Sequence, residues 1–415
     1  QPPCFRVNLA ESENGRKQIL CDGIGGTEPH QSSPDTPKCV LRGVKMQIEI
    51  YNMTVLNDKL NISLEAVCDS FSSLLWDIEY YKCGAFEVYI AASPRNIEIF
   101  QTGRIVGRDD DKEHFGLIES VELETDAEDG DYLIIKGRFL MCLLERRIIY
   151  PTFNFTKLVS YSQIAMNVVQ YNACTTGIRK LPGLVVGCSS GTCWDTKTKL
   201  QVSYDNLMEW VYTICEKIGG TANIRLSKTD NEQYEMIFEL SQGTDRSILQ
   251  EVNPHIIFSD RYNNLLSFTY FTDTSVKKNY AYVLGKGEGE KRKRTTYFEG
   301  AEPSSLDRYE VYVDAKDISD EEQVDNETRP LSDAEYSELL KEKGKQNLVT
   351  TKTKSESQIA VQSTQFQYGV DYFVGDFVTV EHHRFGIRQN KIQLVGMIES
   401  FDHNGRNLTP TFKEA

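Results

Sequence analysis

The sequence predicts a β-rich α+β fold in which two β-barrel domains flank a small inserted α/β region. Tyr and Phe are abundant, with 21 and 19 residues, and Thr, Val and Ile recur in short runs bounded by Gly, Asn and Asp. This composition is typical of short strands separated by turns. A chain of 415 residues is also too long for one ordinary domain. We therefore expect several hydrophobic cores along the chain.

The first 45 residues lack the pattern of a folded domain. They hold three of the ten cysteines and five of the 12 prolines, and neither strand alternation nor a helical period is visible. Just before Met46, residues 41–45 include an Arg-Gly-Val triplet, which a purine-rich run like a bacterial ribosome-binding site can encode. We expect residues 1–45 to be a spuriously translated leader and the protein to start at Met46. The alternative is a natural disordered arm.

Residues 46–150 predict an N-terminal β-barrel domain. An acidic turn at 126–131 carries Asp129-Gly130, a dipeptide favoured in tight hairpins. Short strands punctuated this regularly are typical of a closed or nearly closed barrel. The expected strands lie at 85–91, 97–100, 114–124 and 132–141.

Residues 151–255 predict an inserted α/β domain. Apolar residues recur every three to four positions in 162–174, which indicates one helix. A second helix is expected to begin at Asp205 as its N-cap and to end at Gly219-Gly220. A hairpin that turns at Asp230-Asn231 is expected to follow.

Residues 256–345 predict a connecting region that contains a β-hairpin and a charged helix. The Gly-rich segment 285–294 lacks the spacing of a phosphate-binding P-loop, so a hairpin tip is the favoured interpretation. Ser332 and Glu335 form a capping box for a helix that is expected to run to about Lys343 and to be closed by Gly344. The expected strands lie at 265–271, 280–284 and 295–298.

A basic cluster lies in that hairpin tip, at Lys291, Arg292, Lys293 and Arg294. It is a candidate contact with an acidic partner surface. A solvated loop accounts for the cluster equally well.

Residues 346–415 predict a C-terminal β-barrel domain. They contain the pattern Tyr-x-x-x-Tyr-x-x-Gly-Asp-x-Val-x-Val, which includes Tyr372, Gly375 and Asp376 as expected barrel-turn residues. Gly375 is expected where φ is positive or where backbone approaches closely, because a Cβ costs free energy there. Asp376 is expected to hold the turn by accepting hydrogen bonds from nearby amides.

This pattern resembles the C-terminal barrel of phage tail-hub proteins, and residues 46–412 resemble the siphophage Gp-thirty-seven-like family of baseplate hubs. The resemblance implies tube-type barrels near both ends of the chain and a structural, non-enzymatic role. It also implies a homotrimeric ring of six barrels at the virion tail tip, assembled in the cytoplasm of the bacterial host. Further features that support the resemblance lie at 60–76, 103–108, 205–240 and 285–289.

The same resemblance implies a set of partners. They are further copies of the chain, the distal tail protein, the tape-measure protein, and receptor-binding or wall-degrading tip proteins. Phage DNA is expected only in transit through the lumen, and a net charge of −15 suits a conduit that repels phosphate. No stable membrane insertion is expected, because no stretch approaches the roughly 20 apolar residues that cross a bilayer.

Two other functions compete with the hub: a tail-associated cell-wall hydrolase and a secreted β-rich adhesin. No GxSxG, HExxH or cysteine-protease pattern occurs in the sequence. His382 and His383 are adjacent on a predicted strand and would point to opposite faces, and Cys188 and Cys193 form only half of a zinc site. We expect no catalytic residue, metal or cofactor. A zymogram on host peptidoglycan would separate a hub from a hydrolase.

Overall fold

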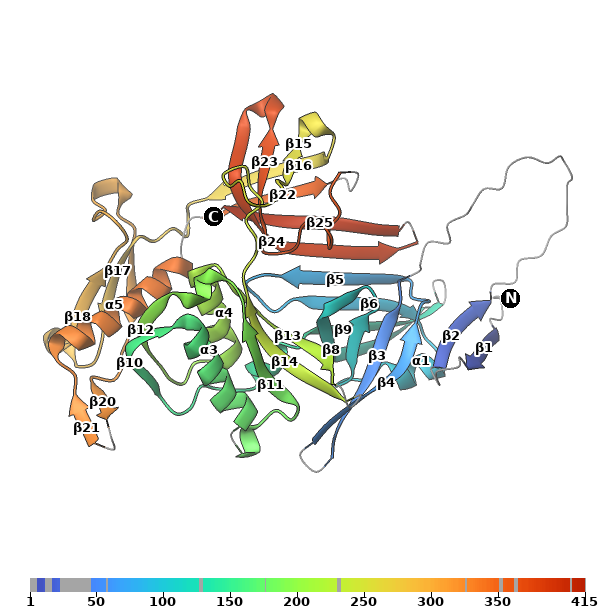
Figure 1. The fold of residues 1–415 in the computed structure, drawn as a ribbon, viewed down its shortest axis with the longest axis horizontal. Helices are drawn as coiled ribbons and strands as arrows, with labels where there is room; N and C mark the ends of the chain where they lie inside the picture. Colours follow the sequence, from blue (N-terminus) through green and yellow to red (C-terminus); the bar gives the residue numbers. More distant parts are fainter. Residues whose placement is uncertain are drawn as a thin grey trace, which may run out of the picture.

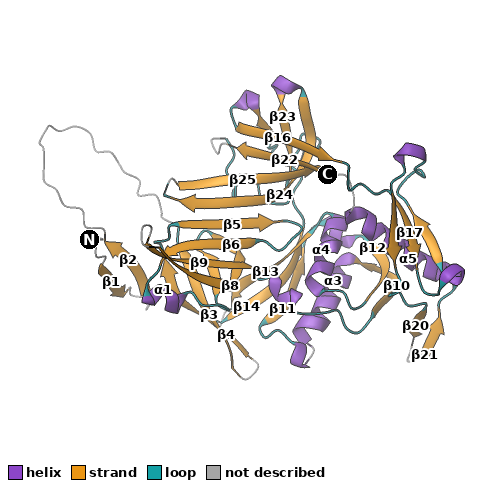
Figure 2. Cartoon of the chain, turned by 180° about the vertical axis from the view of Figure 1, so that it is seen from behind, coloured by secondary structure: helices purple, strands orange, loops and turns teal. Residues whose placement is uncertain are grey.

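The computed structural model describes residues 6–11, 17–22, 46–56, 59–126, 130–175, 177–229, 233–324, 327–350, 354–361, 365–403 and 405–414. Strands dominate these residues, and the predicted β-rich fold is confirmed. Figures 1 and 2 show a long central sheet with α3 (Tyr161–Val169), α4 (Leu207–Ile218) and α5 (Asp333–Thr350) at one end of it and the short helix α1 (Pro94–Ile99) at the other. The turn dipeptides expected at Asp129 and at Asp230-Asn231, and most of the expected leader, lie outside the described residues.

Seven strands after Met46 form what we call the N-terminal strand group, in the order β4-β3-β7-β8-β9-β6-β5 with antiparallel neighbours. The edge strand β4 is joined to β2 (Lys17–Asp22) by one residue pair, and β2 pairs with β1 (Arg6–Glu11). The seven are β3 (Ile48–Leu56), β4 (Lys59–Cys68), β5 (Ser73–Glu79), β6 (Ala85–Ala91), β7 (Ile105–Arg108), β8 (Asp111–Asp126) and β9 (Gly130–Phe139).

The strand expected at 97–100 is wrong, because α1 (Pro94–Ile99) occupies this segment. The Ser93 side chain accepts a hydrogen bond from the Asn96 N–H at 3.0 Å. Pro94 then stands in the first turn, where its missing N–H costs nothing. This local start signal outweighs the brief apolar alternation that suggested a strand.

Six strands form the C-terminal strand group, in the order β15-β23-β24-β25-β22-β16. The long strand β24 pairs with β25 along one edge, while β23 and β5 pair with successive stretches of it. The two groups therefore merge into one open sheet of 15 described strands, in which no closed barrel is formed. The six are β15 (Ile257–Ser259), β16 (Leu265–Asp273), β22 (Lys354–Val361), β23 (Phe377–His382), β24 (Ile387–Asp402) and β25 (Gly405–Glu414).

An α/β region lies between the two groups in sequence. Its central sheet has the order β11-β14-β13, and β10 pairs with β12. The helix α4 begins at Asn206 and not at Asp205, because the Asn206 Oδ1 accepts from the N–H groups of Met208 and Glu209. It ends as predicted at Gly219, whose φ is 76°. The elements are α2 (Cys142–Glu145), β10 (Phe153–Ser160), α3 (Tyr161–Val169), the π-helix η1 (Gln170–Thr175), η2 (Gly177–Arg179), β11 (Leu184–Ser189), β12 (Lys197–Val202), α4 (Leu207–Ile218), β13 (Thr221–Lys228) and β14 (Tyr234–Ser241).

A smaller unit is inserted between β16 and β22, and it contains the predicted capping box. The Ser332 N–H donates to the Glu335 carboxylate at 2.9 Å, and the Glu335 N–H donates to the Ser332 Oγ at 3.3 Å. The prediction that Gly344 closes this helix is wrong, because α5 continues to Thr350. A Cβ on Gly344 would lie 2.7 Å from Cγ2 of Val283, so this glycine lets the helix lie close on β17. The elements are β17 (Tyr280–Leu284), β18 (Arg294–Tyr297), β19 (Glu310–Asp314), β20 (Glu321–Val324), β21 (Glu327–Pro330) and α5 (Asp333–Thr350).

Three hydrophobic cores stabilise this arrangement. One joins β3, β4, β7 and β8 to the helices of the α/β region. A second spans both strand groups, from Trp76 on β5 to Met397 on β24 and Phe412 on β25. The third lies between α5 and its small sheet. The first core contains residues of the N-terminal strand group and of the α/β region, and the second contains residues of both strand groups. The strand groups and the α/β region therefore pack as one body.

Candidate functional site at the junction of the strand groups

Gly375 lies where the C-terminal strand group meets the N-terminal one. Its φ of 103° falls in the region that favours glycine. A Cβ on Gly375 would lie 2.3 Å from Cε2 of Tyr80. The Gly375 N–H donates to the Leu394 carbonyl at 2.6 Å, and the Gln393 side chain donates to the Gly375 carbonyl at 3.0 Å. Both the conformation and the space at this position therefore require glycine.

Asp376 ties the same turn to the chain that leaves the α/β region. Its side chain is buried and accepts from the Thr244 N–H at 2.7 Å and from the Phe373 N–H at 3.1 Å. It also forms an ion pair with Arg246, with Nε 2.9 Å from Oδ2. Charge-assisted bonds of this kind are the stronger class of hydrogen bond.

Tyr80 brings a third unit into the junction. Its hydroxyl donates to the Gly219 carbonyl at 3.2 Å and accepts from the Gly243 N–H at 2.9 Å. Burial raises the pKa of Tyr80 above its usual range, so the hydroxyl remains a donor at every physiological pH. The Thr221 hydroxyl donates to the Tyr80 carbonyl at 2.5 Å. We name the set Tyr80, Gly243, Gly375 and Asp376 the junction.

Two peripheral contacts reinforce the junction, while Tyr372 does not take part in it directly. The Tyr81 hydroxyl donates to the Gln393 Oε1 at 2.7 Å, and Lys413 pairs with Glu216 at 2.7 Å. Tyr372 is buried in the C-terminal core, with its ring centroid 5.4 Å from that of Phe258. Tyr372 therefore anchors the segment that leads into the Gly375 turn in the core that spans both strand groups.

We expect Asp376→Asn to weaken the junction by about 2–4 kcal/mol. The amide keeps the size of the side chain but loses the charge that pairs with Arg246 and one of the acceptor oxygens, which leaves buried donors unsatisfied. Denaturant unfolding of the two proteins measures the change. Asp371→Asn is the control, because its exposed carboxylate accepts one amide at 2.7 Å and its loss should cost about 1 kcal/mol or less. Equal effects at both positions would contradict the role of Asp376.

A buried charge network joins the strand groups at a second place. The Arg108 side chain is 2% exposed and pairs with Glu399 of β24 at 3.1 Å, and with Asp110 at 2.8 Å. Its guanidinium lies 4.7 Å from the ring centroid of Phe401. Arg406 pairs with the same Glu399 carboxylate at 2.5 Å. Hydrogen bonds and charge from Asp110 and Glu399 outweigh burial and raise the pKa of Arg108, which remains charged.

His114 and Asp111 form an ion pair beside this network, with Nδ1 2.9 Å from Oδ2. Burial alone would lower the pKa of His114, but the Asp111 carboxylate raises it above the usual value by more. The pKa of Asp111 is lowered by His114, against the opposing effect of its own burial. The pair therefore stabilises the fold above about pH 4. The contribution of His114 is complete below about pH 6.5 and is lost as the pH rises through its folded-state pKa.

We expect His114→Gln to lower the free energy of unfolding by about 1–3 kcal/mol at pH 5.5, and by less at pH 8.5. Urea unfolding at the two pH values measures the difference. His403→Gln is the control, since His403 is exposed in the turn after β24. If the loss of unfolding free energy in His114→Gln were larger at pH 8.5 than at pH 5.5, the raised pKa of His114 would be contradicted.

The basic cluster at Lys291–Arg294 is partly used inside the protein. Arg292 donates to the carbonyls of Gly285 and Leu284 at 2.6 and 2.7 Å and pairs with Asp314. Lys293 pairs with Asp333 at the start of α5. Lys291 and Arg294 are exposed at the surface. Arg292 is therefore used inside the protein, Lys293 is exposed but already paired, and Lys291 and Arg294 are free to face a neighbour.

The residues weighed for chemistry are two cysteines and two adjacent histidines. Cys188 is exposed and Cys193 half-buried, both as free thiols. His382 ends β23 while His383 begins the 3₁₀ turn η7 (His383–Phe385), so the strand prediction holds only for the first. Within the described ranges, no group of three or more His, Cys, Asp or Glu side chains is placed to hold a metal ion. None of the described helices is long and apolar enough to span a membrane.

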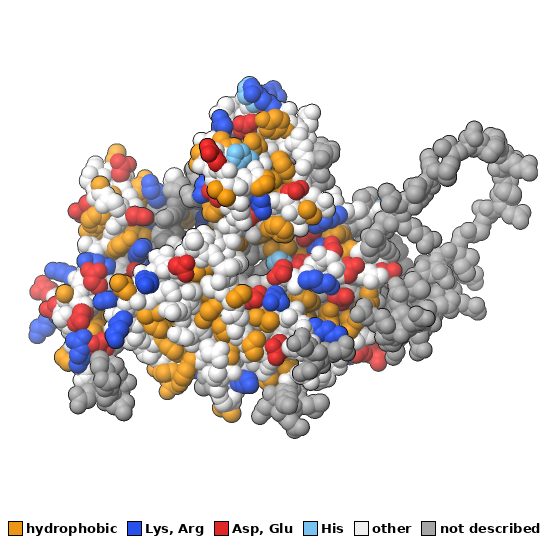
Figure 3. All heavy atoms as spheres, viewed as in Figure 1, with side chains coloured by type: hydrophobic (Ala, Val, Ile, Leu, Met, Phe, Trp, Pro, Cys, Tyr) orange, Lys and Arg blue, Asp and Glu red, His pale blue; other side chains and the backbone are white. Residues whose placement is uncertain are grey.

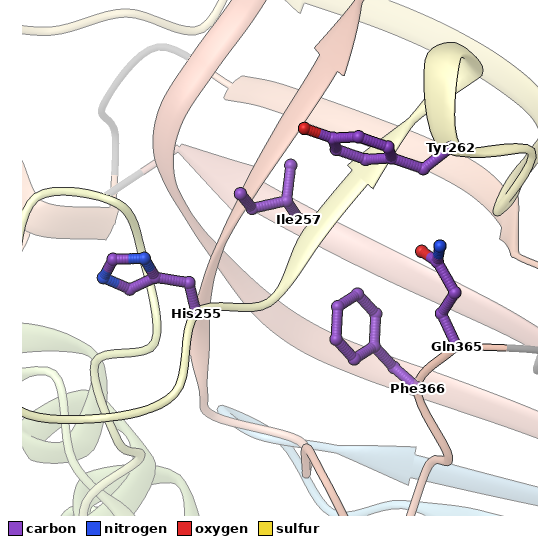
Figure 4. A pocket seen from close by; sticks show the side chains of 5 residues that line it. All are labelled: His255, Ile257, Tyr262, Gln365 and Phe366. Carbon is purple, nitrogen blue, oxygen red and sulfur yellow. The ribbon is translucent and has the colours of Figure 1, made fainter.

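A pocket of about 380 Å³ lies on the C-terminal strand group, lined by the five side chains of Figure 4. Ile257 and Phe366 contribute apolar side chains to its lining, and Tyr262 and Gln365 contribute a hydroxyl and an amide. His255 turns away and contacts the Gln250 carbonyl at 2.6 Å. This mixture lacks a pair of carboxylates or a nucleophile with its base, which hydrolytic sites use.

Comparison with known proteins identifies the chain. Residues 48–412 match the profile of the family described as Siphovirus ReqiPepy6 Gp37-like protein. The chain belongs to this family. No curated protein matches it in sequence.

Two solved structures have a similar fold. A tail protein from Neisseria meningitidis MC58 aligns with a TM-score of 0.52 and 13% identity, over 89% of this chain and 96% of that one. A 43 kDa tail protein of prophage MuSo2 from Shewanella oneidensis aligns with a TM-score of 0.52 and 10% identity, over 88% of this chain and 98% of that one. At such identities the likeness concerns the fold. This Gp37-like protein thus has the fold of phage tail proteins.

The sequence pointed to Gly375 and Asp376 but missed their partners. Tyr80 lies almost 300 positions earlier, and Gly243 and Arg246 follow the α/β region without a recognisable motif. The Arg108–Glu399 pair spans 291 positions. No local signal marks such residues, because each acquires its role only when distant segments fold together.

Proposed function

We propose that this Gp37-like protein is the baseplate hub of a siphophage tail: three copies form a ring that closes the distal end of the tail tube. The family and the fold indicate a tail protein. The observation that favours a hub is the rigid coupling of two strand groups within one chain, through the junction and the Arg108–Glu399 pair. Three chains with two strand groups each would offer six tube-like units to a six-fold tail tube.

In this proposal the strand groups complete tube-type barrels when neighbouring copies supply the missing contacts. The C-terminal group has six strands in the order β15-β23-β24-β25-β22-β16. Its two end strands, β15 and β16, follow each other in the chain and are joined by a short turn. The N-terminal group lies within residues 46–150 and most of the α/β region within 151–255, while the connecting region 256–345 contributes β15 and β16 to the C-terminal group, whose other strands lie in 346–415. Residues 1–45 would be the spuriously translated leader, or the natural disordered arm, that the sequence predicts.

The partners follow from this position at the tail tip. The distal tail protein would bind one face and the tape-measure protein the lumen, while receptor-binding or wall-degrading proteins would attach distally. The net charge of −15 favours passage of DNA without retention. Lys291 and Arg294 of the exposed hairpin would contact an acidic neighbour. Membership in a family of tail proteins favours a structural role over a hydrolytic one.

The mass and shape of the purified full chain test this function. We expect light scattering to give three times 47.3 kDa and negative-stain images to show rings with a central opening. A monomer at every concentration up to about 100 μM would overturn the hub. Clearing of host peptidoglycan in a zymogram would favour the hydrolase instead.

A further inference from the structure

A group of four cations lies beyond the end of β9, and among the described residues only Arg146 has a carboxylate, that of Glu145, close enough to affect its charge. Arg147 donates to the carbonyls of Arg179 and Arg146 at 2.6 and 2.9 Å, and Arg179 donates to the Tyr150 carbonyl at 3.0 Å. Arg146 and Lys180 extend from the same place and are exposed. Within the part of the chain that the structure describes, none of these four side chains forms an ion pair. Burial, together with the nearby charges of Arg179 and Arg146, lowers the pKa of Arg147.

Exposed apolar and aromatic side chains surround these cations. Tyr150 is 55% exposed, Tyr204 68%, and Ile178 is fully exposed. The Tyr150 and Tyr204 rings lie 6.2 Å apart. Figure 3 shows hydrophobic side chains along the lower edge of the molecule, below α3. We name Arg146, Ile148, Tyr150, Ile178, Lys180 and Tyr204 the basic–aromatic patch.

The backbone of Tyr204 indicates that the patch has a use. Its φ of 59° is in the left-handed region, which a bulky side chain enters only at a cost of about 1–3 kcal/mol. No burial of the ring offsets that cost, because the side chain is exposed. Tyrosine and arginine are also the residues enriched where protein surfaces bind one another.

The complementary surface occurs on the same chain. At the far end of the β8–β9 ladder, Glu122, Glu124 and Asp131 are exposed, and Leu123 between them is 53% exposed. We name residues 122–126 and 130–131 the acidic hairpin. Glu122 and Glu124 share one face of the strand and Leu123 lies on the other, so the hairpin carries a pair of carboxylates that matches the cations of the patch. Figure 3 shows Asp and Glu side chains gathered at the right-hand side of the described molecule.

One copy cannot bring these two surfaces together. The β8–β9 ladder runs from Gly116 opposite Phe139 to Asp126 opposite Gly130, about 30 Å at the usual rise per residue. The acidic hairpin is the second of these ends, while Arg146 follows the first end after the short helix α2. The contact therefore needs two molecules in a head-to-tail arrangement, and such contacts generate closed rings or open filaments.

We propose that the acidic hairpin of one copy docks on the basic–aromatic patch of the next copy, and that this contact builds the hub ring. This inference rests on the proposed function and names its interface. Glu122 and Glu124, which share one face of β8, meet Arg146 and Lys180, and the exposed rings of Tyr150 and Tyr204 cover the hairpin beside them. Complementary charge fixes the partner and the register, and apolar burial supplies affinity.

A charge-exchange experiment on the full chain tests the contact. The variant Arg146→Glu/Lys180→Glu is expected to raise the dissociation constant of the trimer at least about tenfold in sedimentation at low salt. The variant Glu122→Lys/Glu124→Lys is expected to do the same. A chain that carries all four changes is expected to recover most of the affinity, which it can do only if it folds. Lys197→Glu/Lys199→Glu is the matched control, with the same change of net charge on the exposed side of β12.

Each outcome decides between the two proposals. A wild-type monomer overturns both the ring and its interface. A wild-type trimer whose affinity survives both double variants overturns the interface and leaves the hub intact. If the chain with all four changes does not recover the trimer affinity, the patch does not bind the hairpin. If the double variants lose no more affinity than the Lys197→Glu/Lys199→Glu control, the loss is an effect of net charge alone.

Discussion

Gly375→Val is expected to separate the C-terminal strand group from the rest of the protein. The new side chain meets two obstacles, a φ of 103° and a Tyr80 ring atom 2.3 Å from the position of its Cβ. Backbone strain costs about 1–3 kcal/mol and overpacking a further 1–3 kcal/mol, so we expect a loss of roughly 2–6 kcal/mol. The cores around Trp210 and α5 do not contain Gly375 and should persist. Thermal unfolding should then separate into an early transition of the C-terminal strand group and a later transition of these cores.

Gly369→Val is the matched control for this substitution. Gly369 has a φ of 84° in the same strand group, but nothing lies within 4 Å of a Cβ placed there. It therefore carries the backbone strain without the collision with Tyr80. We expect it to lose about 1–3 kcal/mol and to keep its oligomeric state. A Gly375→Val protein with unchanged thermal stability would refute the junction as a link between the strand groups.

Arg108→Ala is expected to destabilise the protein by about 3–5 kcal/mol. Removal of the guanidinium leaves the Glu399 carboxylate, whose side chain is 3% exposed, with only Arg406 as a charged partner. It also leaves a void against Trp76 and Phe401, whose rings the guanidinium contacts. Denaturant unfolding followed by tryptophan fluorescence measures the loss, because Trp76 lies in this site.

Arg138→Ala separates the effect of burial from the loss of an ion pair. Arg138 pairs with Glu119 at 2.8 Å and with Glu145 at 2.7 Å, but its side chain is 34% exposed. Water screens such pairs, so we expect a cost of about 1 kcal/mol or less. Equal losses for Arg108→Ala and Arg138→Ala would show that the strand groups are held together by apolar packing alone.

The junction and the Arg108 network lie at different places on the seam between the strand groups. The junction holds the turn before β23 against the end of β5, and Arg108 holds β24 near its C-terminal end, at Glu399. A tail tip must resist forces transmitted along the tube. Two separate attachments prevent one strand group from rotating about the other, and this supports the hub that we propose.

The sequence by itself determined the features that depend on neighbouring residues. The capping box of Ser332 and Glu335, the end of α4 at Gly219 and the strand at Tyr280–Leu284 all occur where the local pattern predicts them. Each is decided by hydrogen bonds or backbone preferences within a few positions, so a short stretch of sequence contains all the information needed. The abundance of strand-forming residues likewise predicted a β-rich chain.

The tertiary structure alone decided what happens where distant segments meet. Gly344 is a helix-ending residue by its sequence, yet α5 continues through it because contact with Val283 requires the absence of a side chain. The predicted barrels remain open because β5 and β24 pair with each other. Tyr80 and Glu399 acquire their roles from partners 163 and 291 positions away. Such contacts depend on which surfaces pack together, and the free energy of that packing belongs to the whole chain rather than to any of its segments.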